Sequence, residues 1–161
     1  MRHIISVLVE NEPGALSRLV GLFSQRGYNI ETLNVAPTED STLSRLTLTT
    51  YGNEHKIEQI TKQLNKLIDV IRVADYIDCT AVERELALIK VAAEPEQRAQ
   101  ILQLVEIFRA RVIDVGERDM LIEMTGGCEK VDAFANLMDN YGIREMARTG
   151  VIAMARGHKT A

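Results

Sequence analysis

The pattern of hydrophobic and polar positions divides the first half of the chain into alternating strands and helices. Residues 3–9 are apolar and β-branched, which is typical of a buried strand. Hydrophobic residues then recur at helical spacing between Pro13 and Gly27, and these two residues suit the first turn and the end of a helix. Residues 30–35 alternate again and predict a second strand.

The next segments complete a recognisable order of elements. Residues 43–51 alternate with a period of two and predict a third strand. Gly52-Asn53-Glu54 opens a second helix, and residues 70–77 predict a fourth strand. The order βαββαβ predicts the ferredoxin-like arrangement, in which two helices cover one face of an antiparallel sheet.

The second half of the chain repeats this order. The charged segment Glu83-Arg84-Glu85 predicts a break in the structure and a domain boundary. The elements expected after it are a strand at 86–91, a helix opened by Pro95-Glu96, strands at 112–115 and 120–125, a helix after Gly126-Gly127, a last strand at 143–154 with a break at Gly150, and a frayed tail at 157–161. We therefore expect an α+β protein with two ferredoxin-like βαββαβ domains, at residues 1–79 and 80–161.

Composition narrows the class of protein. The chain has 161 residues, 46% of them hydrophobic and 26% charged, which is ordinary for a globular protein. No apolar run approaches the roughly 18 residues of a membrane span, and the first residues lack the features of a signal peptide. A net charge of −4 and few aromatic residues argue against nucleic acid as a partner. We expect a cytoplasmic protein that binds neither membranes nor nucleic acids.

Metal and catalytic chemistry find little support in the sequence. Cys79 and Cys128 are isolated, which fits a reducing compartment and indicates neither a disulfide framework nor a zinc site. His3, His55 and His158 are scattered over different expected elements. No nucleophile–base pair or pair of acids occurs at a spacing that favours an enzyme. We predict no catalytic residues and no metal site.

The first strand-to-helix turn, Asn11–Leu16, has the chemistry of a carboxylate-binding site. The start of a helix leaves backbone N–H groups unpaired and carries partial positive charge. Gly14 lets a ligand approach the backbone, and Asn11 offers both a donor and an acceptor. The plainer alternative is that Asn11 only caps the helix and Gly14 only turns the chain.

Asn29 lies at the opposite end of the same expected helix, so one chain does not easily bring it to the turn. A two-fold dimer in which these helices run antiparallel would place Asn29 of one chain opposite the turn of the other. The second half has Pro95-Glu96 where the first has Pro13-Gly14. We therefore expect a site made by Gly14 to occur once per chain.

Several segments resemble a known family. Val9–Leu16 followed by Gly27–Glu31 is similar to an ACT domain, a small regulatory module that often binds amino acids. The whole chain from Arg2 to about Gly157 resembles the small regulatory subunit of bacterial acetohydroxyacid synthase, also called acetolactate synthase. The segments that carry this resemblance are Leu22–Ile30, Leu43-Ser44-Arg45, Gln63–Leu67, Val82–Leu86 and Ala147–Gly150.

The resemblance implies a role and a set of partners. Such subunits form dimers and bind a catalytic subunit that condenses two 2-keto acids with thiamine diphosphate. They raise its activity and confer feedback inhibition by valine or another branched-chain product, leucine or isoleucine. Thiamine diphosphate, Mg and FAD are expected only in the catalytic subunit, so this chain needs no cofactor.

The resemblance also implies where valine binds. It would lie between two ACT domains, in contact with Asn11, Gly14, Ala15 and Leu16 of one chain and with Asn29 and Ile30 of the other. The alternative function is that of a free-standing ACT-type sensor that regulates a different enzyme.

Overall fold

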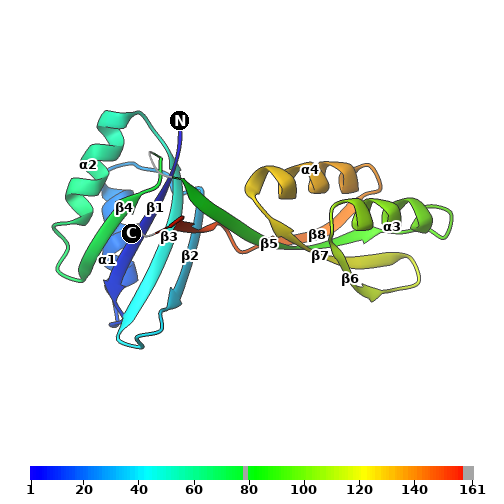
Figure 1. Cartoon of the computed structure of the whole chain (residues 1–161), viewed down its shortest axis with the longest axis horizontal. Helices are drawn as coiled ribbons and strands as arrows, with labels where there is room; N and C mark the ends of the chain where they lie inside the picture. The colour runs from blue at the N-terminus through cyan, green and yellow to red at the C-terminus, as the bar shows by residue number, and fades with distance from the viewer. Residues whose placement is uncertain (78–79, 158–161) are drawn as a thin grey trace. The chain divides into compact units, whose positions relative to one another are not determined.

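The chain forms two compact units (Figure 1). The computed structural model describes residues 1–77 and 80–157. The first unit comprises residues 1–82 together with the chain from Gly150 onward, and the second comprises residues 83–149. None of the helices in these described ranges is long and apolar enough to cross a membrane. The assignment of separate functions to residues 1–79 and 80–161 stays a prediction.

The first unit has the predicted βαββαβ order. Its elements are β1 (Arg2–Glu10), α1 (Ala15–Gln25), β2 (Thr32–Pro37), β3 (Leu43–Tyr51), α2 (Glu54–Leu64) and β4 (Val70–Asp75). The strands form an antiparallel sheet in the order β2-β3-β1-β4. Both helices lie on the same face of this sheet (Figure 1). The fold class predicted for this half is confirmed.

The core of the first unit follows from the alternation in its strands. Ile5 and Val7 of β1 pair with Leu48 and Leu46 of β3, and all four are buried. The helices add buried side chains at helical spacing, including Phe23 of α1. Burying each large apolar side chain stabilises the fold by roughly 1.5–3 kcal/mol. This core fixes α1 against the sheet and so fixes the turn that precedes it.

The second unit repeats the topology. Its elements are β5 (Ala81–Ala92), α3 (Arg98–Ile107), β6 (Arg111–Val115), β7 (Asp119–Gly126), α4 (Cys128–Asp139) and β8 (Ile143–Arg148). The strands are ordered β6-β7-β5-β8, which is the same arrangement as in the first unit. The helix expected to open at Pro95-Glu96 begins later, at Arg98, because Glu94–Gln97 forms a turn closed by a 2.9 Å bond from the Gln97 N–H to the Glu94 carbonyl.

The charged segment Glu83-Arg84-Glu85 lies inside strand β5, so the expected break in the structure is wrong there. The segment does coincide with the division between the units, which falls between residues 82 and 83. A strand tolerates these charges because Glu85 is buried with a cationic partner, Arg148. The density of charged residues alone therefore does not predict that this segment forms a strand.

The break predicted at Gly150 is confirmed. Gly150 has a left-handed backbone with φ of +80° and separates β8 from a short strand β9 (Ile152–Ala155). A Cβ atom at this position would lie 3.1 Å from Cβ of Thr32, so glycine also permits a close approach. The tail expected at 157–161 lies outside the described residues, apart from Gly157.

Candidate ligand-binding site at the start of helix α1

The turn before α1 is built around Gly14. Its φ of 86° and ψ of −9° place it in the left-handed region, where glycine carries no steric penalty. The Ala15 N–H donates to the Glu12 carbonyl at 3.2 Å, and Gly14 itself accepts from the Arg18 N–H at 3.0 Å. No acidic side chain stands in the first turn of the helix. The partial positive charge of the helix start is therefore not neutralised from within that turn.

Asn11 does not cap the helix, so this plainer interpretation of its role is wrong. Gly14 occupies the N-cap position, and no side chain makes a capping hydrogen bond there. The Asn11 amide group instead donates to the Ser41 carbonyl at 3.0 Å, and its backbone N–H donates to the Thr42 carbonyl at 2.8 Å. Asn11 therefore ties the turn to the β2–β3 connection.

A small cleft opens beside this turn. Its volume is about 70 Å³, and three of the predicted site residues, Asn11, Ala15 and Leu16, line it. The remaining lining residues are Val9, Glu10, Glu12, Leu19, Val35, Ser44 and Leu46. Small-molecule sites usually enclose about 300–1,000 Å³, so a cleft of this size forms only part of a site.

The chemistry of the cleft suits a small zwitterion with an apolar side chain. The helix start favours a carboxylate. Glu10 and Glu12 are also among the lining residues, and their negative charge favours a cationic group nearby. Leu16 and Val35 contribute an apolar wall and remain 42% and 41% exposed.

Asn29 and Ile30 do not line this cleft. They follow the far end of α1, which has 11 residues and is therefore about 16 Å long. The side-chain amide of Asn29 donates to Oε1 of Glu31 at 2.6 Å. The backbone carbonyl of Asn29 accepts a hydrogen bond from the Thr50 hydroxyl at 2.7 Å. Within one chain the cleft thus brings together Asn11, Ala15 and Leu16. Gly14 lies in the same turn but does not line the cleft, and Asn29 and Ile30 lie apart from it.

Sequence reasoning missed an ion pair behind the turn. Nε and Nη2 of Arg18 donate to the two carboxylate oxygens of Asp69 at 2.5 and 3.1 Å. The hydrogen bond from Arg18 lowers the pKa of Asp69 below its usual value. The sequence shows that Arg18 stands one helical turn after Gly14. It does not indicate the partner, because Asp69 lies 51 residues further along the chain.

The other candidates have structural explanations. His3 is buried, with Nδ1 2.9 Å from Oδ2 of Asp75, and His55 Nε2 lies 3.2 Å from Nε2 of Gln59. Cys79 and His158 lie outside the described residues. Among residues 1–77 and 80–157, no group of three or more His, Cys, Asp or Glu side chains could hold a metal ion.

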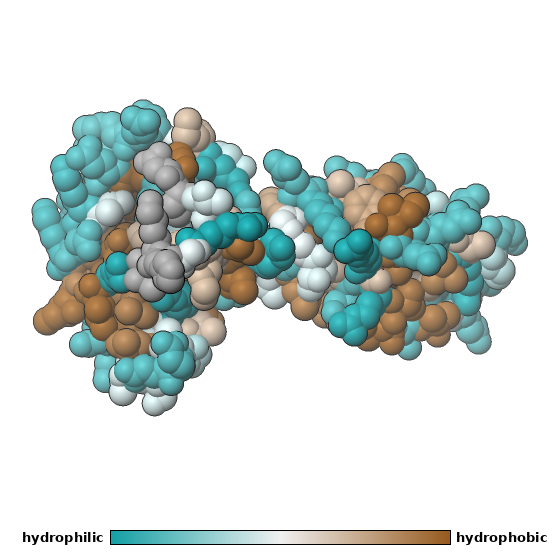
Figure 2. Space-filling model, in the orientation of Figure 1, coloured by the Kyte–Doolittle hydropathy of each residue, from teal (hydrophilic) through white to brown (hydrophobic). Residues whose placement is uncertain are grey.

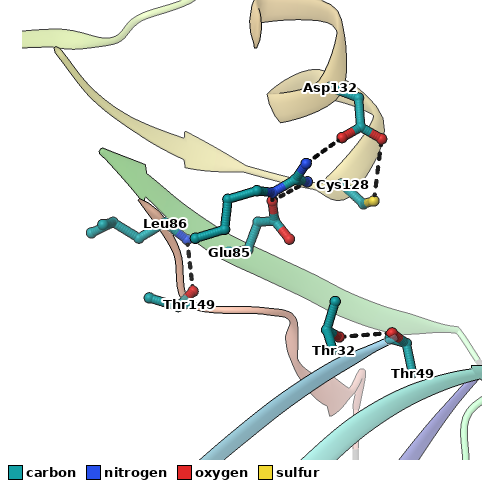
Figure 3. Close-up of polar contacts among 8 residues, drawn as sticks. Thr32, Thr49, Glu85, Leu86, Cys128, Asp132 and Thr149 are labelled. Carbon is teal, nitrogen blue, oxygen red and sulfur yellow. Dashed lines mark hydrogen bonds and ion pairs between the residues drawn. The ribbon is translucent and has the colours of Figure 1, made fainter. Parts of the chain in front are cut away.

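Arg148 takes part in a cluster within the second unit, and Figure 3 labels its partners Glu85 and Asp132. It donates to Oε1 of Glu85 at 2.6 Å and to Oδ1 of Asp132 at 2.7 Å, and the other oxygen of Asp132 lies 3.6 Å from the Cys128 sulfur. Burial lowers the pKa of Arg148, but the hydrogen bonds to Asp132 and Glu85 outweigh it and leave the pKa raised. Thr149 continues the strand pairing by exchanging hydrogen bonds with Leu86.

The βαββαβ fold of the first unit and the family model that it matches define a class of protein, namely proteins that carry an ACT domain. Residues 5–72 match the family model described as the small subunit-like ACT domain of acetohydroxyacid synthase, and residues 84–157 match that of the small subunit of acetolactate synthase. The chain belongs to the family of acetolactate synthase small subunits. It is a regulatory subunit and not a catalytic one.

Similar proteins span the full length of the chain. A probable acetolactate synthase small subunit from Archaeoglobus fulgidus is 53% identical over 159 residues, which cover 99% of both chains. The small subunit of acetolactate synthase isozyme 3 from Escherichia coli is 51% identical over 99% of this chain and 98% of its own. The crystal structure of the Thermotoga maritima small subunit has a TM-score of 0.90 and 43% identity, over 99% of each chain.

Proposed function

We propose that this chain binds the catalytic subunit of acetolactate synthase, raises its activity and makes it sensitive to feedback inhibition by valine. The proposal extends to a cytoplasmic location and to a homodimer as the form that binds valine. The relatives named as small subunits support a catalytic partner. The observation that carries the sensing role is the cleft beside the Gly14 turn, which suits a small zwitterion and encloses only about 70 Å³.

In the proposed site, valine lies between two copies of the chain. Its carboxylate meets the backbone N–H groups of the turn from Gly14 to Leu16, of which that of Ala15 also donates to the Glu12 carbonyl. Its ammonium group meets the side-chain amide oxygen of Asn29 from the other copy. The NH₂ group of that amide donates to Glu31 and leaves the oxygen to accept. Ile30 of that copy closes the apolar wall. Hydrophobic side chains reach the surface of both units in Figure 2, and Leu16 is among the exposed ones.

The expected affinity follows from these contacts. Burying the valine side chain contributes roughly 1.5–3 kcal/mol. Each charge-assisted hydrogen bond adds about 1.5–3 kcal/mol, and ordering the ligand offsets part of the sum. A net free energy of about 5–7 kcal/mol corresponds to a Kd from about 10 μM to the sub-millimolar range. Such a range suits the sensing of a metabolite.

Selectivity and inhibition have physical limits. Leucine and isoleucine differ from valine by one methylene group, which is worth about 1–3 kcal/mol, so discrimination between them is incomplete. Valine inhibits only if it binds the active and inactive arrangements of the complex with different affinity. A site shared by two chains provides this difference when the dimer rearranges.

The test is to mix the chain with an acetolactate synthase catalytic subunit and to measure acetolactate formation during titration with valine, leucine and isoleucine. We expect the chain to raise the rate and valine to lower it again. A catalytic subunit that is neither activated nor made sensitive to valine would refute the proposal. If the chain alone binds a branched-chain amino acid in that case, the alternative of a free-standing ACT-type sensor for a different enzyme is favoured.

A further inference from the structure

The two units share backbone hydrogen bonds at this turn but differ in its side chains and in its conformation. Gly14 is left-handed, whereas Glu96, at the equivalent position, has no positive φ. The backbone N–H of Asn11 donates to the Thr42 carbonyl at 2.8 Å. In the second unit, the backbone N–H of Ala93 donates to the Arg118 carbonyl at 2.9 Å. Asn11 and Ala93 therefore occupy equivalent positions. Counting forward from them, Gly14 corresponds to Glu96, Leu16 to Arg98 and Arg18 to Gln100.

A second matching bond identifies the equivalent of Asp69. The N–H of Glu10 donates to the Asp69 carbonyl at 2.8 Å, and the N–H of Ala92 donates to the Gly142 carbonyl at 2.8 Å. Gly142 has no side chain, and Gln100 instead accepts a 3.4 Å hydrogen bond from the Tyr141 hydroxyl. The second unit thus folds without any counterpart of the Arg18–Asp69 ion pair. The pair is a feature of the unit that carries Gly14 and not a requirement of the fold.

In the second unit, a different arginine holds the turn. Arg98, at the position of Leu16, donates to the carbonyls of Ala93, Gly116 and Glu117 at 3.1, 2.7 and 2.5 Å. Its guanidinium therefore joins the helix start to the β6–β7 connection, as the Asn11 amide does in the first unit. The side chain at the position of Leu16 is committed to holding the turn, whereas Leu16 itself lines an open cleft.

In the first unit, Asp69 ties both ends of the turn. Its carbonyl holds the N–H of Glu10 at the end of β1, and its carboxylate holds the guanidinium of Arg18 in α1. Nη1 of Arg18 lies 2.8 Å from where a Cβ atom on Gly14 would stand. Neither Arg18 nor Asp69 lines the cleft. The turn is thus held from outside the cleft.

We propose that Arg18 and Asp69 are positioning residues for the ligand site. They hold the Gly14 turn in its left-handed geometry, so that the backbone groups of the helix start stay directed at the ligand, while the cleft remains free of protein side chains. This inference rests on the proposed function. It assigns a role in binding to two residues that do not touch the ligand, because pre-organising a site reduces the ordering cost of binding.

The test compares valine binding by the full-length chain and its variants, measured by calorimetry at a temperature at which circular dichroism shows each to be folded. We expect Arg18→Met and Asp69→Asn to weaken binding roughly tenfold or more, as for the loss of one charged hydrogen bond. Arg18→Lys keeps the charge without the planar fork, so its loss is smaller. The matched control Arg98→Met removes the brace of the other unit and should stay within about twofold of wild type.

Amide hydrogen exchange distinguishes positioning from general stability. We expect Arg18→Met to accelerate exchange at the turn, residues 10–17, more than in helix α2. Folded variants that bind valine as wild type does would overturn the inference. Weaker binding with equal acceleration of exchange throughout the first unit would overturn it too. A wild-type chain that binds no branched-chain amino acid would instead refute the proposed function. If Arg18→Met does not fold, Arg18→Lys carries the same comparisons.

Discussion

The carboxylate of Glu85 is buried, with only 1% of its side chain exposed, and it accepts a 2.6 Å hydrogen bond from Nε of Arg148. The two residues stand 63 positions apart, on strands β5 and β8. A carboxylate removed from water is costly unless a cation and hydrogen bonds compensate for it. Arg148 therefore compensates a charge that the strand would otherwise bury at a penalty.

The first prediction concerns this pair. Arg148→Met leaves Glu85 buried without its cation and should lower the free energy of unfolding by about 3 kcal/mol. Replacing both partners, as Glu85→Leu with Arg148→Met, should cost much less, because no buried charge is then left uncompensated. Urea unfolding of each variant measures the difference.

An exposed ion pair provides the control for this prediction. Lys62 lies 2.7 Å from Glu58 one helical turn away on α2, and both side chains are mostly exposed. Lys62→Met should change stability by no more than about 0.5 kcal/mol. If Arg148→Met were as mild as this control, the compensating role of Arg148 would be wrong.

The second prediction concerns Gly14. Gly14→Asp should abolish valine binding, because the position has a φ of 86° and a new carboxylate there would fill the site and repel the carboxylate of the ligand. The added side chain would also meet Arg18, whose Nη1 lies 2.8 Å from the Cβ position, and would compete with Asp69 for it.

Gly14→Asn serves as the matched variant for this position. Asparagine tolerates the left-handed region better than most residues and carries no charge, so binding should be weakened less than in Gly14→Asp. Calorimetry with valine compares the two. Normal binding by Gly14→Asp would show that the turn is not part of the site.

The sequence predicted the elements and their order because apolar residues alternate along the strands and recur at helical spacing along the helices. Alternation in residues 43–51 indicated β3 with the bounds that the structure has. Gly150 marked the break between β8 and β9 because its backbone is left-handed there. Local signals of this kind are sufficient wherever periodicity or backbone conformation decides the structure.

The sequence did not predict which side chains pair across long distances in the chain. Glu85 belonged to a charged segment and was expected in a break, whereas its partner Arg148 allows it to be buried in a strand. Asn11 was a plausible cap, yet its acceptor is the Ser41 carbonyl, 30 residues away. Nothing local specifies such partners, because they are brought together only by the sheet.

The third prediction concerns pH. The pKa of Asp69 is lowered in the folded chain by its hydrogen bonds with Arg18. A carboxyl group whose folded pKa lies below its unfolded value, about 3.9 for Asp, stabilises the fold above that value, and this stabilisation is lost as the pH falls through the folded pKa. We therefore expect the stability of the chain to fall on acidification below about pH 4.

Asp69→Asn isolates the contribution of this group, since other carboxyl groups also titrate in the acid range. Asp40, for example, has a pKa lowered by the hydroxyl and backbone N–H of Thr42. The variant should lose less stability than wild type between about pH 5 and pH 2.5. Thermal unfolding at several pH values measures this, and identical acid profiles for the two proteins would contradict the prediction.

The fourth prediction tests whether the site is shared between chains. Gly14→Asp alters the half of the site at the turn, and Asn29→Ala alters the half beyond the far end of α1. Neither variant alone should bind valine with normal affinity. The backbone carbonyl of Asn29, which accepts from Thr50, is retained in the alanine variant, so the strand should be preserved.

Mixed dimers of the two variants should regain binding. In a two-fold dimer with one chain of each kind, one site receives both changes and the other receives neither. Random pairing makes half of the dimers mixed, so co-expression should restore about one quarter of the wild-type binding sites at wild-type affinity.

A site contained within one chain predicts no recovery, because every chain then carries a defective half. Normal binding by Asn29→Ala alone would instead exclude Asn29 from the site. Calorimetric stoichiometry therefore separates a shared site from both alternatives.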